Sequence, residues 1–249
     1  MNRTSPFGRA VAPMTFVTAA VAALFLAGCS FVTGPSLTGS GNLVTKQYPF
    51  TNFTRISAGS VFDVTVKPGA AAGVTVTVDD NLVDYLDVSN SGDSLRLYLK
   101  SNSNLRNATL KAVVTVPELT GFELSGASKG RVEGCRSAKA LDIDLSGASH
   151  LEGDLESGDV HMGISGASRA DLKGSAANLR LNVSGASHAD LEGLQIHDAK
   201  VDADGASHAT VHPSGKLQAR ASGASTVQYA GQPANVDSQT SGASSVRPK

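Results

Sequence analysis

One cysteine near the start of the chain stands where a lipid could be attached. The tetrapeptide Leu-Ala-Gly-Cys at 26–29 matches the lipobox, at which a bacterial signal peptidase cleaves and leaves a diacylglyceryl group on the cysteine. Two arginines and then the uncharged apolar run 16–27 lead up to it. Because a membrane-spanning helix needs about 20 apolar residues, this run predicts a cleaved secretory signal over 1–28. We therefore expect Cys29 to carry a lipid anchor; the alternative is an ordinary signal peptide with an incidental cysteine.

Histidine and aspartate side chains recur at fixed positions in the second half of the chain. His188 and His208 occupy equivalent positions of adjacent repeats, and so do Asp171 and Asp190. Two imidazoles can share a metal ion or sense pH, and two stacked carboxylates can bind a hard cation such as Ca²⁺. An exposed polar ladder, screened by water and by Arg169, explains the same pattern without a ligand. We predict no resident metal and no cofactor, with these four side chains as weak candidates for a cation site.

Signatures of catalysis are missing from the sequence. It contains no nucleophile elbow, no His-Glu-x-x-His motif and no phosphate-binding loop. β-Helical polysaccharide lyases and hydrolases need convergent carboxylates in a cleft that usually requires long loops. The repeat spacing described below leaves no room for such loops, so we predict a protein that is not an enzyme. A glycan-active enzyme on a β-helix remains the alternative.

The charge balance limits which partners the protein can bind, and the number of cysteines limits what can stabilise the fold. Without the two arginines of the signal, the 21 basic residues fall to 19 against 22 acidic ones, a net charge of −3 with no long run of either sign. This balance disfavours nucleic-acid binding. If Cys29 is acylated, Cys135 is the one thiol left, so no intramolecular disulfide can form and stability must come from packing.

A repeat of about nineteen residues organises the chain from residue 120 onward. The motif Ser-Gly-Ala-Ser, with one Asp-Gly-Ala-Ser variant, begins at Ser125, Ser146, Ser165, Ser184, Asp204, Ser222 and Ser241. Positions one, three and five before each copy are mostly apolar and those between them are mostly polar, a period of two that is typical of strands. We expect these apolar positions, and the motif alanine, to point inward. The motif should form a corner in which serine stacks above serine at about 4.8 Å.

These elements predict an all-β protein, a parallel and right-handed β-helix in which each repeat is one coil. The seven repeats occupy 120–249, and the irregular strand-rich segment 43–119 should form the first coils and the N-terminal cap. Within it, the runs 61–66 and 74–78 predict a hairpin. Residues 29–42, rich in Ser, Thr, Gly and Pro, should be a flexible tether. Toward the C-terminus the inward side chains shorten, which would leave little apolar surface at the tip.

Several of these segments resemble the head GIN domain family, whose label is autotransporter adhesin. The resemblance rests on Phe-Thr-Arg-Ile at 53–56, Phe-Asp-Val-Thr-Val at 62–66, Asp-Asp-Asn-Leu at 79–82 and the recurring Ser-Gly-Ala-Ser coils. It covers about residues 45–245. It implies a parallel β-helix in the bacterial envelope and supplies no catalytic residues.

Together these observations predict a lipid-anchored protein outside the cytoplasm, at the outer membrane if the source is Gram-negative. Its role would be adhesion, binding or scaffolding, with an unidentified protein or glycan as ligand and the membrane as the second partner. A protein-binding component of envelope signalling is a further alternative.

Overall fold

The computed structural model of the chain describes Met1 and residues 36–100 and 104–249. The predicted signal peptide, Cys29 and the first part of the predicted tether lie outside these residues. Within them, no helix is both long enough and apolar enough to cross a membrane.

The described chain is built almost entirely from strands, with one short 3-10 helix, η1 (Asp80–Tyr85). The strands are β1 (Ser36–Thr38), β2 (Leu43–Tyr48), β3 (Arg55–Ala58), β4 (Asp63–Pro68), β5 (Gly73–Asp79), β6 (Leu86–Ser91), β7 (Ser94–Leu99), β8 (Asn104–Arg106), β9 (Leu110–Val116), β10 (Gly121–Leu124), β11 (Lys129–Arg136), β12 (Leu141–Leu145), β13 (His150–Ser157), β14 (Val160–Ile164), β15 (Arg169–Val183), β16 (His188–Ala203), β17 (His208–Pro213), β18 (Lys216–Ala221), β19 (Thr226–Tyr229), β20 (Asn235–Thr240) and β21 (Ser245–Pro248).

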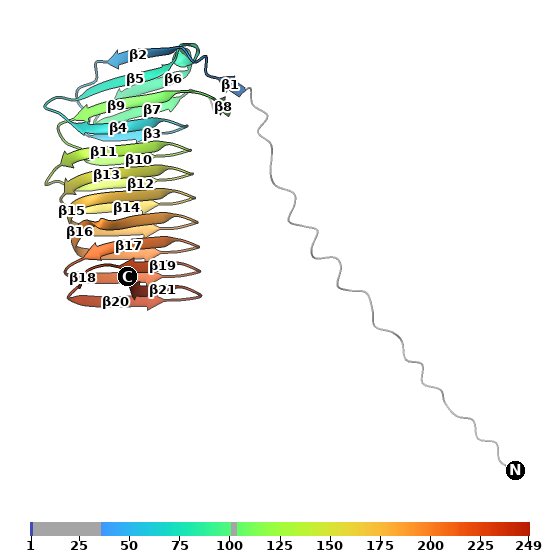
Figure 1. Cartoon of the computed structure of the whole chain (residues 1–249), viewed down its shortest axis with the longest axis vertical. Coiled ribbons are helices and arrows are strands. Elements are labelled where there is room, and N and C mark those ends of the chain that lie inside the picture. Colours follow the sequence, from blue (N-terminus) through green and yellow to red (C-terminus); the bar gives the residue numbers. More distant parts are fainter. Residues whose placement is uncertain (2–35, 101–103) are drawn as a thin grey trace. The chain divides into compact units, whose positions relative to one another are not determined.

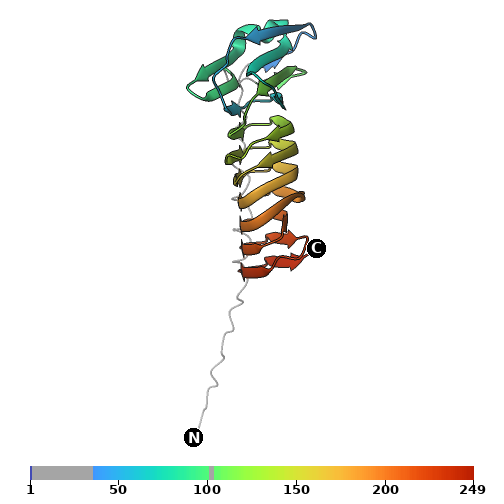
Figure 2. The ribbon, with the colours of Figure 1, turned by 90° about the vertical axis from the view of Figure 1, so that its left-hand side faces the viewer.

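Corresponding strands of successive coils pair in parallel, which confirms the predicted β-solenoid (Figures 1 and 2). Face 1 consists of β3, β10, β12, β14, the second halves of β15 and β16, β18 and β20. Face 2 consists of β4, β11, β13, the first halves of β15 and β16, β17, β19 and β21. Paired residues of neighbouring coils on face 1 lie 18–21 positions apart from β10 onward, in agreement with the repeat spacing.

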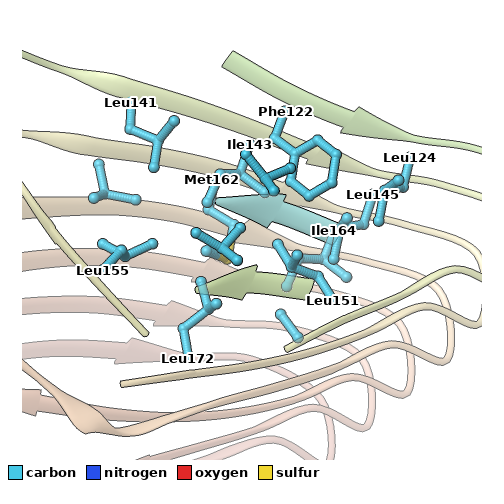
Figure 3. Packing of buried hydrophobic residues seen from close by; sticks show 14 of the residues in the cluster. Phe122, Leu124, Leu141, Ile143, Leu145, Leu151, Leu155, Met162, Ile164 and Leu172 are labelled. Carbon is cyan, nitrogen blue, oxygen red and sulfur yellow. The ribbon is translucent and has the colours of Figure 1, made fainter. Parts of the chain in front are cut away.

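The interior is a continuous apolar stack, and the period-two prediction holds along it. Leu145, Ile164 and Val183 lie in one column and are each at most 2% exposed. Figure 3 shows the side chains of neighbouring coils, such as Ile143 and Met162, packed one above the other. Because each coil needs its neighbours to bury its side chains, no coil is expected to be stable alone.

The Ser-Gly-Ala-Ser corner differs from the prediction in one respect: the motif alanine is exposed and the second serine is buried. In the first copy Ala127 faces solvent, whereas Ser128 is fully buried and donates a hydrogen bond to the Ser125 carbonyl oxygen at 2.8 Å. The alternation itself continues through the corner, because Ser128 lies four positions after the inward Leu124 and Ala127 only three, so a period of two places the serine inward and the alanine outward. Gly126, with a φ of 71°, supplies the left-handed turn of this corner. Stacking is as predicted, since the Ala148 N–H donates to the Gly126 carbonyl of the coil before it at 2.7 Å.

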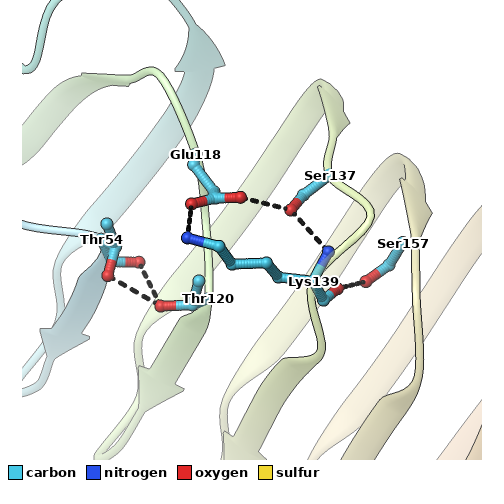
Figure 4. A network of polar contacts seen from close by, with 6 residues as sticks. All are labelled: Thr54, Glu118, Thr120, Ser137, Lys139 and Ser157. Atoms are coloured by element: carbon cyan, nitrogen blue, oxygen red, sulfur yellow. Dashed lines mark hydrogen bonds and ion pairs between the residues drawn. The ribbon is translucent and has the colours of Figure 1, made fainter.

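A second corner is closed by side chains rather than by the backbone alone. Lys139 Nζ donates to Glu118 at 2.6 Å, and Ser137 Oγ donates to the other oxygen of that carboxylate at 2.8 Å (Figure 4). These bonds hold the pKa of Glu118 below its ordinary value. The Ser157 hydroxyl donates to the Lys139 carbonyl at 3.1 Å and ties the next coil to the same corner.

The N-terminal cap overturns the predicted hairpin. β4 and β5 do not pair with each other; β9 lies between them, parallel to β4 and antiparallel to β5. β2 then pairs with the other edge of β5. The apolar pattern identified β4 and β5 correctly as strands. The two edges of β9 supply the hydrogen-bonding partners of these strands, one edge for β4 and the other for β5. This arrangement covers the end of the stack, as a solenoid requires.

Part of the predicted tether also belongs to this cap. Ser36–Thr38 forms β1, which pairs with β8. Beyond it, the buried carboxylate of Asp79 accepts the backbone N–H groups of Gly41 and Thr109, each at 2.7 Å. The composition of 36–42 suggested a flexible chain, but these hydrogen bonds fix it in place.

Candidate functional site

The two histidines singled out by the sequence lie side by side on face 2. The rings of His188 and His208 stack with centroids 4.8 Å apart and an angle of 11° between their planes. Partial burial, reinforced by the charge of Arg169 and by His208, lowers the pKa of His188. The ring of His188 is therefore neutral at neutral pH, and the stack is a contact between flat, partly apolar rings.

The two aspartates also lie in register, and Glu152 joins their column. Glu152 is opposite Asp171, which is opposite Asp190. Arg169 donates from Nε and Nη2 to the two oxygens of Asp171, at 2.7 and 2.8 Å, and this hydrogen bonding lowers the pKa of that carboxyl. Among the residues that the structure describes, no three His, Cys, Asp or Glu side chains are grouped to hold one ion.

A calcium titration separates a cation site from a charge ladder on this face. Because the Arg169 guanidinium occupies both oxygens of Asp171, we expect millimolar Ca²⁺ to leave the Tm of the protein unchanged. The double substitution Asp171→Asn with Asp190→Asn serves as the control. A rise in the wild-type Tm that this double variant loses would establish the cation site instead.

The cysteine among the described residues, Cys135, offers no reactive site. Cys135 is buried, and burial together with the charge of Asp154 raises the pKa of its thiol to about 11. A thiol protonated at neutral pH is a poor nucleophile and a poor metal ligand. The predicted lipidation site, Cys29, lies outside the described part of the chain.

Face 1 carries a group of charges that the sequence analysis missed. Arg55 Nη1 donates to Asp142 at 3.0 Å by crossing Gly121, which has no side chain to block it. This bond lowers the pKa of Asp142, while partial burial and the charge of Glu123 raise the pKa of Asp144. A hollow of about 400 Å³ adjoins these residues. Its signal in the sequence was the pair of glycines at outward strand positions, Gly121 and Gly163, which mark close approaches.

A larger hollow follows on the same face, and we call it the axial trough. It has a volume of about 580 Å³ and takes three consecutive residues from each of four successive coils. These are 182–184, 202–204, 220–222 and 239–241. The middle residue of each triplet is the last inward position of its strand, and the third begins the corner motif. Pairing in register makes the trough run across the strands, from coil to coil.

Comparison with known proteins identifies one family and a common fold. A family model described as "Putative auto-transporter adhesin, head GIN domain" matches residues 52–233. The structure is similar to a putative adhesin from Bacteroides fragilis, with a TM-score of 0.79 and 20% identity over 86% of this chain and 100% of that one. It is also similar to a putative lipid binding protein from Parabacteroides distasonis, with a TM-score of 0.69 and 20% identity over 86% of this chain and 99% of that one. A putative adhesin from Parabacteroides merdae has a TM-score of 0.63 and 18% identity over 87% of this chain and 100% of its own. No curated protein matches the chain. At these identities, the structural similarities establish the fold.

Proposed function

Because the chain belongs to the family of the auto-transporter adhesin head GIN domain, we propose that it is a non-catalytic adhesion or binding protein of the bacterial cell envelope. The observation that supports this most is the regular stack of coils, whose corners stay short while polar side chains line up in columns on both faces. Such columns place polar groups at a regular spacing of about 4.8 Å, which suits an extended ligand. Short corners supply no loops around which a catalytic cleft could be built.

The adhesion role can be tested with the purified, fluorescently labelled protein on intact cells and isolated envelopes of the source bacterium. We expect saturable binding that unlabelled protein competes away and that heat-unfolded protein does not show. Absence of saturable binding to either material would refute the adhesion proposal. Release of new reducing ends from envelope polysaccharide during the assay would refute its non-catalytic part.

The proposal includes a lipid anchor on Cys29. Its support is the lipobox at 26–29 and the apolar run before it. One acyl chain holds a protein to a bilayer only marginally, whereas the several chains of a bacterial lipoprotein hold it firmly. An anchor of this kind would keep the solenoid at a membrane surface outside the cytoplasm.

The anchor makes a direct prediction for Cys29→Ser. This variant should move from the membrane fraction to the soluble fraction and lose metabolic labelling by palmitate. Cys135→Ser is the matched control, because Cys135 is buried in the solenoid and should keep both membrane association and label. A Cys29→Ser protein that stays in the membrane fraction with its label would contradict the anchor.

A further inference from the structure

The axial trough has rims of two different polar columns. One rim consists of the side chains just before the last inward residue of each strand, in order Asn182, Asp202, Arg220 and Gln239. The other consists of the first residues of the corner motifs, in order Ser184, Asp204, Ser222 and Ser241. Four coils at about 4.8 Å give the trough a length of roughly 14 Å along the solenoid axis. Its volume falls within the range of about 300–1,000 Å³ that ligand pockets occupy.

The rim side chains hold one another in place and still face solvent. Arg220 Nε donates to Gln239 Oε1 at 3.3 Å, and Arg220 Nη1 lies 3.7 Å from Asp202 Oδ1. The Arg220 side chain is 61% exposed, so its remaining N–H groups can reach a ligand. On the opposite rim the Ser222 hydroxyl donates to Asp204 at 2.7 Å, which lowers the pKa of that carboxyl and keeps it an acceptor.

We propose that the axial trough binds an uncharged linear glycan that lies along the solenoid axis, with one sugar unit on each coil. This inference rests on the adhesion role proposed above and specifies its ligand. Amide, carboxylate, guanidinium and hydroxyl groups alternate along the rims, and sugar hydroxyls, which both donate and accept, can pair with all of them. A pyranose unit is about as long as the coil spacing of ~4.8 Å, so each successive sugar can meet the polar rim groups of one coil.

Other extended ligands fit the trough less well. A peptide strand advances about 3.4 Å per residue, out of step with the coil spacing of about 4.8 Å. It cannot add to the sheet here either, because the trough strands between its ends are paired on both edges. An anionic polymer would meet two carboxylates, Asp202 and Asp204, against one guanidinium.

The length of the bound segment gives the first test. Cello- and β-manno-oligosaccharides of two, four and six units, whose 1,4-linked sugars keep the 2,3-diol that periodate cleaves, would be titrated against the full protein by calorimetry. The trough residues include no aromatic ring, so affinity must accumulate through hydrogen bonds from sugar to sugar. For a series that binds, we expect the tetramer to bind about tenfold or more tightly than the dimer and the hexamer to gain about twofold at most over the tetramer. Affinity that does not depend on length up to four units would overturn the proposal.

Variants on intact cells provide the deciding test, since it does not depend on knowing the sugar. Arg220→Ala with Gln239→Ala should weaken saturable cell binding by about tenfold or more, and periodate treatment of the cells should abolish binding where protease treatment does not. Arg169→Ala, on face 2, is the matched control and should bind like the wild type; equal Tm values would verify folding. If the protein binds cells but the trough variant binds equally well, or binding survives periodate, the glycan site is wrong while the adhesion proposal stands. If the wild type binds no cells or envelopes, both fail.

Discussion

An Ile164→Asp substitution is expected to lower the free energy of unfolding by on the order of 4 kcal/mol. Ile164 is 2% exposed and lies between Leu145 and Val183 in the same inward column. A carboxylate there has no hydrogen-bond donor from a neighbouring side chain and cannot reach water without separating two coils. Because each coil is stabilised by its neighbours, the loss should spread to the coils on either side. Thermal melts and denaturant titrations would measure it.

Asp144→Lys is the control for that substitution, on the strand of the coil before it. Asp144 faces solvent beside Glu123 and Asp142, whose charges contribute to its raised pKa. A lysine would meet carboxylates of opposite sign, so the stability should change by less than about 0.5 kcal/mol. Equal losses of stability from the two variants would show that the assignment of inward and outward side chains on face 1 is wrong.

Gly166→Ala is expected to be the second severe substitution, although it adds only a methyl group. Gly166 has a φ of 77°, and a Cβ at this position would overlap the Gly147 carbonyl oxygen in the coil before it. That oxygen accepts the N–H of Ala167 at 2.8 Å, so it cannot move away without breaking the corner ladder. We expect a loss of about 4 kcal/mol or more, and failure to fold in the extreme.

Gly92→Ala separates the two causes of that loss. Gly92 has a φ of 60° but nothing lies within 4 Å of the position its Cβ would take. Gly92→Ala should therefore lower the free energy of unfolding only by the strain of an alanine in a left-handed backbone conformation, about 1–2 kcal/mol. If Gly166→Ala costs no more than Gly92→Ala, close stacking of the corners does not limit which residues the motif accepts.

Periodicity predicted the solenoid because the same signal recurs in every coil. Leu145, Ile164 and Val183 were placed correctly by their phase, since strand alternation is a property of the backbone itself. The motif alanine was misplaced because it lies three positions after the last inward residue of its strand, so the same alternation that buries Leu145 turns Ala148 outward. A buried serine at the corner is not visible as a core residue by composition, yet its hydroxyl is satisfied there by a carbonyl three residues earlier, as in Ser128 with Ser125.

The strand pairing of the cap and the hollows of face 1 could not be predicted from the sequence, for different reasons. Pairing of β9 between β4 and β5 depends on which edges meet in space, and strand propensity does not encode that choice. The contact of Arg55 with Asp142 joins residues 87 positions apart. The axial trough is built from ordinary polar residues whose meaning appears only when four coils are stacked in register.

The direction of the hydrogen bonds has a mechanical consequence. The strands lie across the long axis of the solenoid, so the bonds between coils point along it, and β20 and β21 form the end opposite the cap (Figure 1). Tension between the two ends would load every interface between coils in series and peel the coils off one at a time. Each detached coil of about 19 residues would release roughly 60 Å of chain. A solenoid stretched between an anchor and a ligand would therefore lengthen in steps and absorb work before either attachment failed.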